Sequence, residues 1–497
     1  MFRSITTSIS YIFIAASLAA CTGATEELAN LSLGTPVVPT DTSTTTTTGT
    51  STGTTDNTNT DNTDNTDVTT DTVIVAQKTA CDDLYDINFS LVSGLDASPV
   101  ALFAEPVKGI SALDPTYGTC MTRVTDFANE APSGFARNDY ARRQAFNADE
   151  TKILIYALNG YWHLYDANTF EYIKQLNLGG SDVEPQWSPT DPDVLYKFPM
   201  NGGMTIHKYN VITDQNTIVT DFRSVSSING HAGSTSIQDI WPTAARVWTK
   251  AEGSPSKDAR YWGLQVETSG FAPLGMITYD MESNTVTGVF DLTATSAGRP
   301  DHVSMSPTGD YIVPSWYSDF SSCNGTPTSN PCGLMSYTRD FSLAVRLAAT
   351  GEHSDIALDA SGNDVVVMSN YRTGFLEAYD VATGQVTQLW NMYVSGSATA
   401  LHVSGKAYNK PGWVLVSTYA TNGSDQWYTN KIMAVEIAAN PRILNISHTY
   451  HEDAGYFSEP HAVVNRDFTK VLFNSNWHSN DEEVDAYMVQ LPTNALD

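Results

Sequence analysis

The amino-acid sequence predicts an all-β fold, a seven-bladed β-propeller that follows a disordered N-terminal tether rich in Thr and Asp. After residue 80 the chain consists mostly of short alternating apolar runs, each bounded by Gly, Asp, Asn or Pro, which is typical of strands joined by tight turns. A strand–turn–strand unit recurs at intervals of roughly 40 to 50 residues, the spacing expected of propeller blades. Before these units, residues 40–72 contain almost only Thr, Asp, Asn, Gly and Ser.

The N-terminus is predicted to be a lipoprotein signal peptide that covers residues 1–20. Arg3 precedes an apolar run, residues 11–18, that is too short to hold a helix across a bilayer. The run ends in LAAC (18–21), which resembles the lipobox of bacterial lipoproteins and implies lipidation of Cys21. Because Cys21 is not followed by Asp, the resemblance also implies the outer membrane or cell surface of a Gram-negative bacterium. An ordinary signal peptide with a chance cysteine is the alternative.

Residues 21–80 are expected to form a lipid-anchored disordered linker, because their polar composition cannot bury enough apolar area to offset the entropy of ordering. The chain has a formal charge of −29; Arg3 contributes +1 and the eight acidic residues between 26 and 71 contribute −8, so residues 72–497 carry −22. This charge argues against nucleic acid and an anionic membrane surface as partners, which leaves the lipid anchor as the only membrane contact. It also repels a polyanionic substrate unless cations reverse the field locally.

Four cysteines remain besides Cys21, and an exported chain permits disulfides. Three connectivities are possible, and we favour Cys81 with Cys120 and Cys323 with Cys332, the last two of which bracket the turn-rich stretch NGTPTSNP. We expect both disulfides to link loop segments covalently and so to stabilise them. The sequence contains no CxxC metal-binding motif.

Seven copies of the repeating unit can be counted in the predicted propeller domain, residues 81–497. The inner hairpins are clear in most blades, but the third inner strand must lie within 231–249, where no turn signal stands out. Residues 114–126 have strand character and are expected to pair with the last blade and close the ring, which leaves few exposed strand edges. The blades are expected near residues 140–178, 182–222, 238–293, 300–348, 351–392, 398–447 and 456–491.

Histidines recur at the start of four predicted inner strands, and these are His302, His353, His402 and His461. When the strands are aligned on their turns, His302 and His461 occupy equivalent positions, and His353 and His402 lie two residues earlier. Side chains two residues apart on a strand point to the same face, so all four histidines share one face. Because the first strand of each blade lines the central channel, they are expected to converge at one channel mouth. Polar side chains near the same level are Arg143, Gln144, Glu184, Gln186 and Glu459.

Convergent imidazoles with carboxamide and carboxylate neighbours are a donor set that suits manganese, zinc or iron. Buried histidines that hydrogen-bond neighbouring blades are the alternative.

The pattern that includes DHVSMSPTGDYIV (301–313) and EPHAVVNRDFTKVLFNSNW (459–477) is similar to the oligogalacturonate lyase family over roughly residues 137–491. This resemblance implies a propeller that degrades acidic polysaccharides with a divalent metal, manganese or calcium, held by histidines and a glutamine at the channel mouth. By this resemblance the metal ligands are His302, His353 and His461, and Gln186 or His402 completes the set. The closely spaced His-x-His of the family does not occur here.

If the reaction is β-elimination, the site must neutralise a uronate carboxylate, remove the adjacent proton and help the glycosidic oxygen to leave. Arg143 and Arg299, like Arg142, stand at or next to inner-strand starts and are candidates for the first task; stem packing with surface ion pairs is their alternative role. His231, in the Gly-flanked loop INGHAGS, is the candidate base, although a loop histidine is often only solvated. Tyr261 and Tyr317 are the candidate acids.

The predicted domain contains no GxSxG elbow, P-loop, HExxH motif or dinucleotide-binding fingerprint. The sequence therefore favours an enzyme, a monomeric polysaccharide lyase that cleaves an acidic, uronate-containing polysaccharide or oligosaccharide by metal-assisted β-elimination. Two alternatives stay open. One is a non-catalytic cell-surface propeller that binds glycan or protein, and the other is a glycoside hydrolase that uses Glu184 and Glu459 as its two carboxylates.

Overall fold

The computed structural model describes residues 81, 83–86, 88–130, 136–250, 252–316, 323–480 and 482–497. The chain divides into two units, residues 1–78 and 79–497, and all described residues belong to the second. The signal peptide, the lipidation of Cys21, the linker and the candidate acid Tyr317 therefore lie outside the described residues. Within the described part, no helix is long and apolar enough to cross a membrane.

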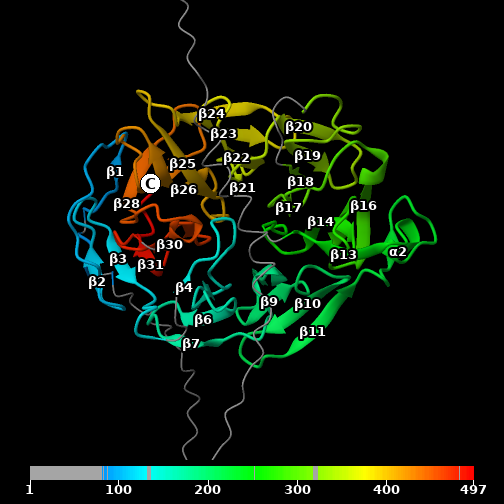
Figure 1. Ribbon diagram of the computed structural model, residues 1–497, viewed down its shortest axis with the longest axis horizontal. Helices are drawn as coiled ribbons and strands as arrows, with labels where there is room; N and C mark the ends of the chain where they lie inside the picture. The colour runs from blue at the N-terminus through cyan, green and yellow to red at the C-terminus, as the bar shows by residue number, and fades with distance from the viewer. Residues whose placement is uncertain are drawn as a thin grey trace, which may run out of the picture. The chain divides into compact units, whose positions relative to one another are not determined.

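The described residues of the second unit form a seven-bladed β-propeller, in which antiparallel sheets stand side by side around a central axis (Figure 1). In the first, second, fourth and fifth blades the first strand lies nearest the axis and later strands lie progressively outward, whereas the third, sixth and seventh blades carry an earlier strand at their outer edge. The first blade contains Phe146, bridged to Ile153, followed by β5 (Lys152–Ala157), β6 (Trp162–Asp166) and β7 (Tyr172–Gln175). The second contains β8 (Gln186–Trp187), β9 (Val194–Lys197), β10 (Thr205–Asn210) and β11 (Asn216–Asp221).

The next three blades follow the same order. The third contains β13 (Ala244–Trp248), β14 (Tyr261–Thr268), β15 (Pro273–Asp280) and β16 (Thr285–Asp291), with β12 (Ser227–Ile228) parallel to β16 at the outer edge. The fourth contains β17 (His302–Met305), β18 (Tyr311–Ser315), β19 (Leu334–Thr338) and β20 (Ala344–Ala348). The fifth contains β21 (Ser354–Leu358), β22 (Asp364–Asn370), β23 (Phe375–Asp380) and β24 (Val386–Asn391).

The last two blades include strands from the N-terminal part of the domain. The sixth contains β25 (Ala398–Ser404), β26 (Trp413–Asn422), β27 (Lys431–Glu436), β28 (Ile443–His448) and β1 (Val92–Ser93). The seventh contains β29 (Val463–Val464), β30 (Lys470–Ser475), β31 (Asp485–Gln490), β3 (Cys120–Arg123) and β2 (Ser111–Leu113), and β4 (Ala136–Arg137) bridges β31 to β5. The helical elements are α2 (Ile237–Ile240) and the single 3-10 turns η2 (Ser181–Val183), η3 (Leu292–Ala294) and η4 (Tyr456–Ser458).

The core lies between the blades, and β5 shows why the sequence folds this way. Its side chains alternate between the two faces of the sheet, and both faces are apolar. Ile153 and Ile155 pack with residues of the seventh blade, whereas Leu154 and Tyr156 pack with residues of the second. A strand that is buried on both faces therefore holds its blade to both neighbours.

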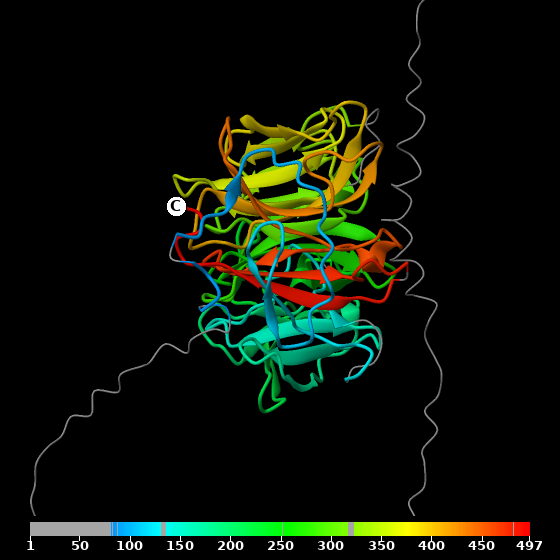
Figure 2. The same ribbon diagram turned by 90° about the vertical axis from the view of Figure 1, so that its left-hand side faces the viewer.

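The ring is closed by pairing the two ends of the domain. β3 runs antiparallel to β31, with Cys120 opposite Gln490 and Arg123 opposite Tyr487. Figure 2 shows the N-terminal segments, in blue and cyan, beside the C-terminal strands in red. A disulfide joins Cys120 in β3 to Cys81, and a second joins Cys323 to Cys332, the connectivity that the sequence favours.

The third blade contains a feature that the repeat pattern does not indicate. After β13 the chain does not turn at once into β14 but continues along β17, where Val303 N donates to Thr249 O at 3.2 Å and Met305 N donates to Ser254 O at 2.8 Å. An ideal Cβ on Gly253 would lie 1.9 Å from Val303 O. Only glycine therefore fits at this position.

Replacing Gly253 by Ala is expected to lower the free energy of unfolding by about 1–3 kcal/mol, because the methyl group must push two backbones apart. Chemical unfolding monitored by circular dichroism measures the change. Gly298→Ala is the matched control, since a Cβ at Gly298 meets no atom within 4 Å. Equal stability of the two variants would contradict the close approach.

Candidate functional site

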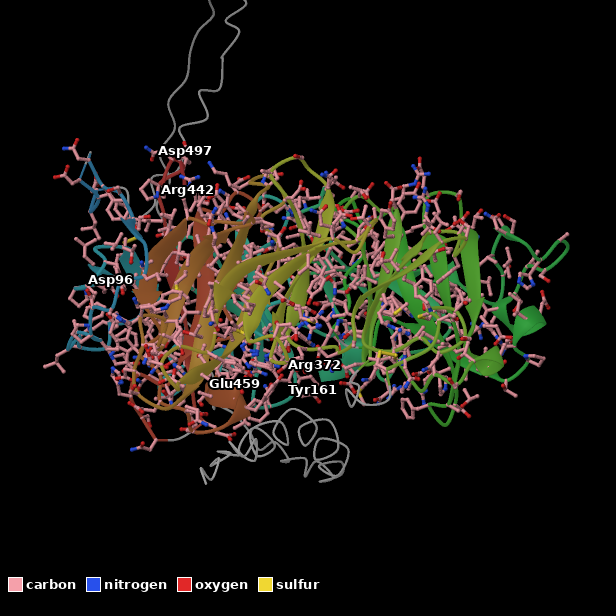
Figure 3. All side chains as sticks on the ribbon, turned by 90° about the horizontal axis from the view of Figure 1, so that it is seen from above. Asp96, Tyr161, Arg372, Arg442, Glu459 and Asp497 are labelled. Carbon is pink, nitrogen blue, oxygen red and sulfur yellow. A yellow bond between two sulfur atoms is a disulfide. The ribbon has the colours of Figure 1, made fainter. Side chains whose placement is uncertain are left out.

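The inner-strand histidines lie at one end of the channel. His302 is the first residue of β17, His353 directly precedes β21, and His461 precedes β29 by two residues. His402 lies within β25, a longer inner strand. Figure 3 shows Glu459, Tyr161 and Arg372 toward one face of the propeller, and Arg442 and Asp497 toward the opposite face.

Two of these histidines and a glutamate form a compact buried group, which we call the histidine–glutamate cluster: His402, Glu459 and His461. Their possible ligand atoms all lie within 4.8 Å of one another. Glu459 Oε2 is 3.3 Å from His402 Nε2 and 3.6 Å from His461 Nε2, and the two imidazole rings are 4.3 Å apart. These distances bring three donor atoms around one point.

Several atoms of this cluster have no hydrogen-bond partner among the described residues. They are both ring nitrogens of His402, Nδ1 of His461 and Oε2 of Glu459. Buried polar atoms are nearly always paired, so four unpaired atoms in one cluster need an explanation. Two imidazoles and a carboxylate are a donor set that fits Mn²⁺, Fe²⁺ or Zn²⁺, and the cluster can therefore hold a divalent metal.

The electrostatics of the cluster agree with this fit. Burial lowers the pKa of both histidines well below its usual value, and the charges of neighbouring cations add to this effect. Burial also raises the pKa of Glu459 well above its usual value, and Asp453 adds to it. The imidazoles are therefore neutral, as metal ligands must be, and ionisation of the carboxyl group requires a nearby positive charge.

His353 lies against the cluster without being part of it. Its ring stacks on that of His402 with a centroid distance of 4.6 Å. Its Nδ1 is 3.0 Å from the carbonyl oxygen of Leu401, which can only accept, so Nδ1 carries the proton and Nε2 carries the lone pair. The hydroxyl of Tyr419 is 3.2 Å from the same Nδ1, and its ring stacks on His402 at 4.7 Å.

His302 lies in a second group, the arginine cluster, which consists of Arg142, Glu252 and His302. Arg142 Nη1 is 2.6 Å from His302 Nε2, and Arg142 also forms an ion pair with Glu252. Asp301 Oδ2 is 3.3 Å from His302 Nδ1. Because a guanidinium already occupies the Nε2 side of His302, a second cation is disfavoured there. The structure therefore places this predicted metal ligand beside an arginine, apart from the histidine–glutamate cluster.

The other residues singled out from the sequence lie elsewhere. Gln186 donates from Nε2 to Gly253 O at 3.1 Å, and Arg143 pairs with Asp139 at 2.7 Å. Arg299 pairs with Glu267 on the third blade. His231 follows β12, the outermost strand of that blade, near the outer rim where Figure 1 shows α2. The structure does not bring His231 together with the channel residues, and its role as the base stays a prediction.

Three residues at the mouth were not found from the sequence. Tyr140 precedes Arg142 by two residues, and its ring lies 5.3 Å from that of His402 and 5.0 Å from that of His461. Glu252 belongs to the stretch after β13 that has no counterpart in other blades. Tyr419 lies on β26, the second strand of its blade, and no sequence motif marks it.

Glu184, one of the two candidate hydrolase carboxylates, is buried beside Thr249. Its Oε2 accepts from the Thr249 backbone N at 3.1 Å and from the Thr249 hydroxyl. Burial raises the pKa of Glu184 from 4.5 to about 8. Because the folded protein holds this proton more tightly than the unfolded chain, the contribution of Glu184 to stability is fully present below pH 4.5 and is lost as the pH rises toward 8.

Glu184→Gln is expected to reduce the loss of stability that occurs as the pH rises. The amide oxygen still accepts a hydrogen bond from Thr249, but the side chain carries no charge. The expected gain in the free energy of unfolding at pH 8 is about 1–3 kcal/mol, with little change at pH 5. Urea unfolding at the two pH values measures it, with the exposed Glu171→Gln as control. A decline as steep as that of the wild type would show that Glu184 does not cause it.

No protein-family model matches the chain, and no curated protein matches it in sequence. Solved structures do match in fold. One is an oligogalacturonate lyase in complex with manganese, with 14% identity, a TM-score of 0.54, and coverage of 79% of this chain and 98% of that one. Another is the oligogalacturonate lyase of Vibrio parahaemolyticus, with 12% identity, a TM-score of 0.52, and coverage of 78% and 99%. At these identities the likeness establishes a shared propeller fold.

Proposed function

We propose that this protein is a polysaccharide lyase that cleaves a uronate-containing polysaccharide or oligosaccharide by β-elimination at the channel mouth. The observation that carries the proposal is the buried histidine–glutamate cluster, whose nitrogen and carboxylate atoms are unpaired, close to a buried arginine. The fold shared with oligogalacturonate lyases, one of them bound to manganese, supports it.

His402, Glu459 and His461 would hold the divalent metal, manganese being the first choice and calcium the second. A carboxylate with two imidazoles favours manganese, because calcium prefers a shell of oxygen ligands. When bound, the ion stabilises negative charge that develops on the uronate carboxylate. The residues of the chain itself account for substrate binding and proton removal.

Arg142 is the group that binds the uronate carboxylate. Its guanidinium is buried and is held in place by Glu252 and His302, so little entropy is lost when it binds. A fixed cation is needed for a polyanion to approach a domain whose surface is acidic. The two clusters are also coupled, since burial lowers the pKa of His402 and the charge of Arg142 lowers it further.

His353 is the base. Burial, followed by the positive charge of Arg142, lowers its pKa, so the imidazole is neutral near pH 7 with its lone pair on Nε2. Nε2 takes the proton from the carbon next to the carboxylate. The electron pair of that C–H bond forms a carbon–carbon double bond, the bond to the glycosidic oxygen breaks, and the leaving oxygen takes a proton from solvent.

The proposal is tested by incubating purified protein with fragments of pectate, ulvan and alginate in the presence of Mn²⁺ or Ca²⁺. The expected result is a rise in the ultraviolet absorbance of an unsaturated uronate, together with about one metal ion per chain in elemental analysis. Absence of product on all three substrates would remove the lyase assignment. Cleavage products without the double bond would favour a hydrolase, and neither product nor bound metal would favour a binding propeller.

We also propose that the protein is a monomeric lipoprotein of the outer membrane or cell surface, attached through Cys21 and a disordered linker. The sequence LAAC (18–21) supports this, as does the polar composition of residues 40–72. Growth with an alkyne-labelled fatty acid is expected to label the wild type and not Cys21→Ser. Equal labelling of the two would contradict the anchor.

A further inference from the structure

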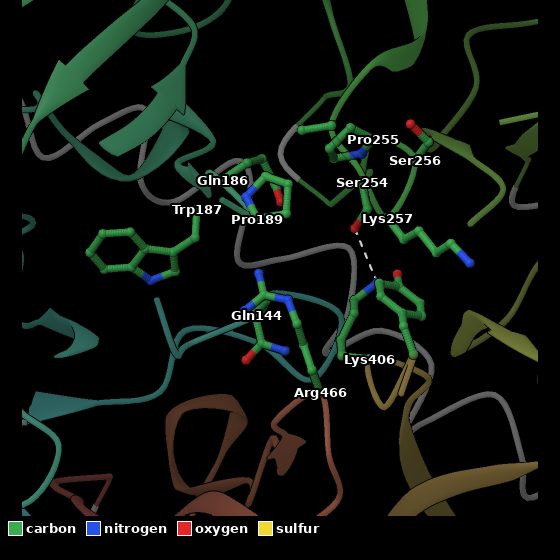
Figure 4. Close-up of a pocket in the computed structure, with 12 residues that line it drawn as sticks. Gln144, Gln186, Trp187, Pro189, Ser254, Pro255, Ser256, Lys257, Lys406 and Arg466 are labelled. Atoms are coloured by element: carbon green, nitrogen blue, oxygen red, sulfur yellow. Dashed lines mark hydrogen bonds between the residues drawn. The ribbon is translucent and has the colours of Figure 1, made fainter. Parts of the chain in front are cut away.

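A pocket lies along the central channel beyond the arginine cluster, toward the ends of the inner strands, and one of its lining residues, Ser254, donates from Oγ to the carbonyl oxygen of Arg142 at 3.3 Å (Figure 4). It is lined by residues of five blades, including Gln186 and Trp187 of β8 and Lys406, which follows β25. Lys406 lies four residues beyond His402 in sequence, a distance of about 13 Å along an extended chain. The turn after β25 reaches the face that carries the C-terminus, because Lys410 Nζ pairs with Asp497 at 2.7 Å.

The charge of this pocket is opposite to that of the domain. Three cationic side chains line it, Lys257, Lys406 and Arg466, and none of its lining residues is Asp or Glu. The ammonium of Lys406 is satisfied, since Nζ lies 2.8 Å from Asp355 Oδ1 and donates to Ser254 Oγ at 3.1 Å. Its positive charge is therefore balanced within the protein.

Arg466 is not balanced in this way, and Lys257 is exposed to solvent at the edge of the pocket. Within the described part of the chain, no carboxylate lies within ion-pair distance of either side chain. Arg466 Nη1 donates to Asn147 O at 3.1 Å, and Figure 4 shows the side chain directed toward the space between Trp187 and Lys406. Burial lowers the pKa of Arg466 despite nearby acidic groups. A partly buried cation without a counter-ion is unfavourable, and an anion in the pocket would remove that cost.

The neutral groups of the pocket restrict which anion fits. The Nε2 of Gln186 donates to Gly253 O, which leaves its Oε1 to accept a hydrogen bond from a ligand hydroxyl, and Trp187 forms an apolar wall. We propose that this pocket is a second binding site, separate from the channel mouth, for a small hydroxylated carboxylate of about the size of one sugar acid. Arg466 and Lys257 bind its carboxylate. The inference holds whether or not the protein is a lyase.

Calorimetric titration with galacturonate tests the site, and galactose serves as the uncharged probe. We expect galacturonate to bind and galactose not to bind. Arg466→Gln and Lys257→Gln should each weaken galacturonate binding about tenfold or more, because each removes a charge-assisted contact. Lys208→Gln, a lysine on the outer part of the second blade, is the control and should bind as the wild type does.

Repeating the titration with Arg142→Met distinguishes binding in the pocket from binding at the channel mouth. The pocket should keep its affinity in that variant, because Ser254 bonds to the backbone carbonyl of Arg142, which the substitution retains. Absence of galacturonate binding, or unchanged affinity in both Arg466→Gln and Lys257→Gln, would overturn the proposal. Equal affinity for inorganic phosphate would overturn the assignment to a hydroxylated carboxylate, because charge alone would then explain binding.

Discussion

Replacing His402 by Gln is expected to reduce bound divalent metal from about one ion per chain to nearly none and to abolish measurable lyase activity. His402 contributes two unpaired ring nitrogens to the histidine–glutamate cluster and lies nearest to Glu459. Loss of a hydrogen-bond partner behind a metal ligand costs about 10–100-fold in affinity or activity, so loss of a ligand should cost at least about 100-fold. Elemental analysis and the ultraviolet assay measure the two effects.

His163→Gln is the matched control for this prediction. His163 is also buried, but it lies in β6, where its Nε2 is 3.2 Å from Asn159 Oδ1. We expect this variant to keep its metal and its activity. A folded His402→Gln protein with a full complement of metal would contradict the assignment of the cluster, whatever its activity.

Replacing Arg142 by Met should lower kcat/KM by about 10²–10³, the usual cost of removing a donor that stabilises developing negative charge. It should also raise the pKa of His302, because burial and then the charge of Arg142 hold that pKa below its usual value. Nuclear magnetic resonance of the imidazole ring measures the pKa. This second readout separates loss of the guanidinium from a general loss of fold.

Arg442→Met provides the comparison, since Arg442 lies on the opposite face and pairs with Glu436 in an exposed position (Figure 3). We expect it to leave both kcat/KM and the titration of His302 unchanged. If Arg142→Met retains wild-type kcat/KM, the carboxylate of the substrate is bound by another group.

The propeller fold could be predicted because it depends on features that are local in sequence. The alternation of apolar residues and the turn residues can both be recognised within a single blade. Every blade repeats these features at a regular interval along the sequence. The third blade was the exception. Its inner strand β13 lies within the expected window, but the stretch around Gly253 follows β17 instead of turning, and contact between two blades leaves no periodic signal.

The site could be predicted only to the level of which strands contribute to it. Alignment brought His302, His402 and His461 to one end of the channel, but it could not say which of them share a point. That depends on side-chain direction and on neighbours such as Arg142, whose guanidinium contacts His302. His461 has a positive φ of 41°, a local backbone geometry that strand alignment does not anticipate.

The pairing of β3 with β31 has a consequence for how the protein is made. Arg123 and Asp485, which form an ion pair across this seam, are 362 residues apart. During synthesis the earlier strand emerges with an unpaired edge and has no partner until β31 has been synthesised. Completion of the seventh blade is therefore a late, slow folding step, and truncated chains that lack β31 are expected to be aggregation-prone.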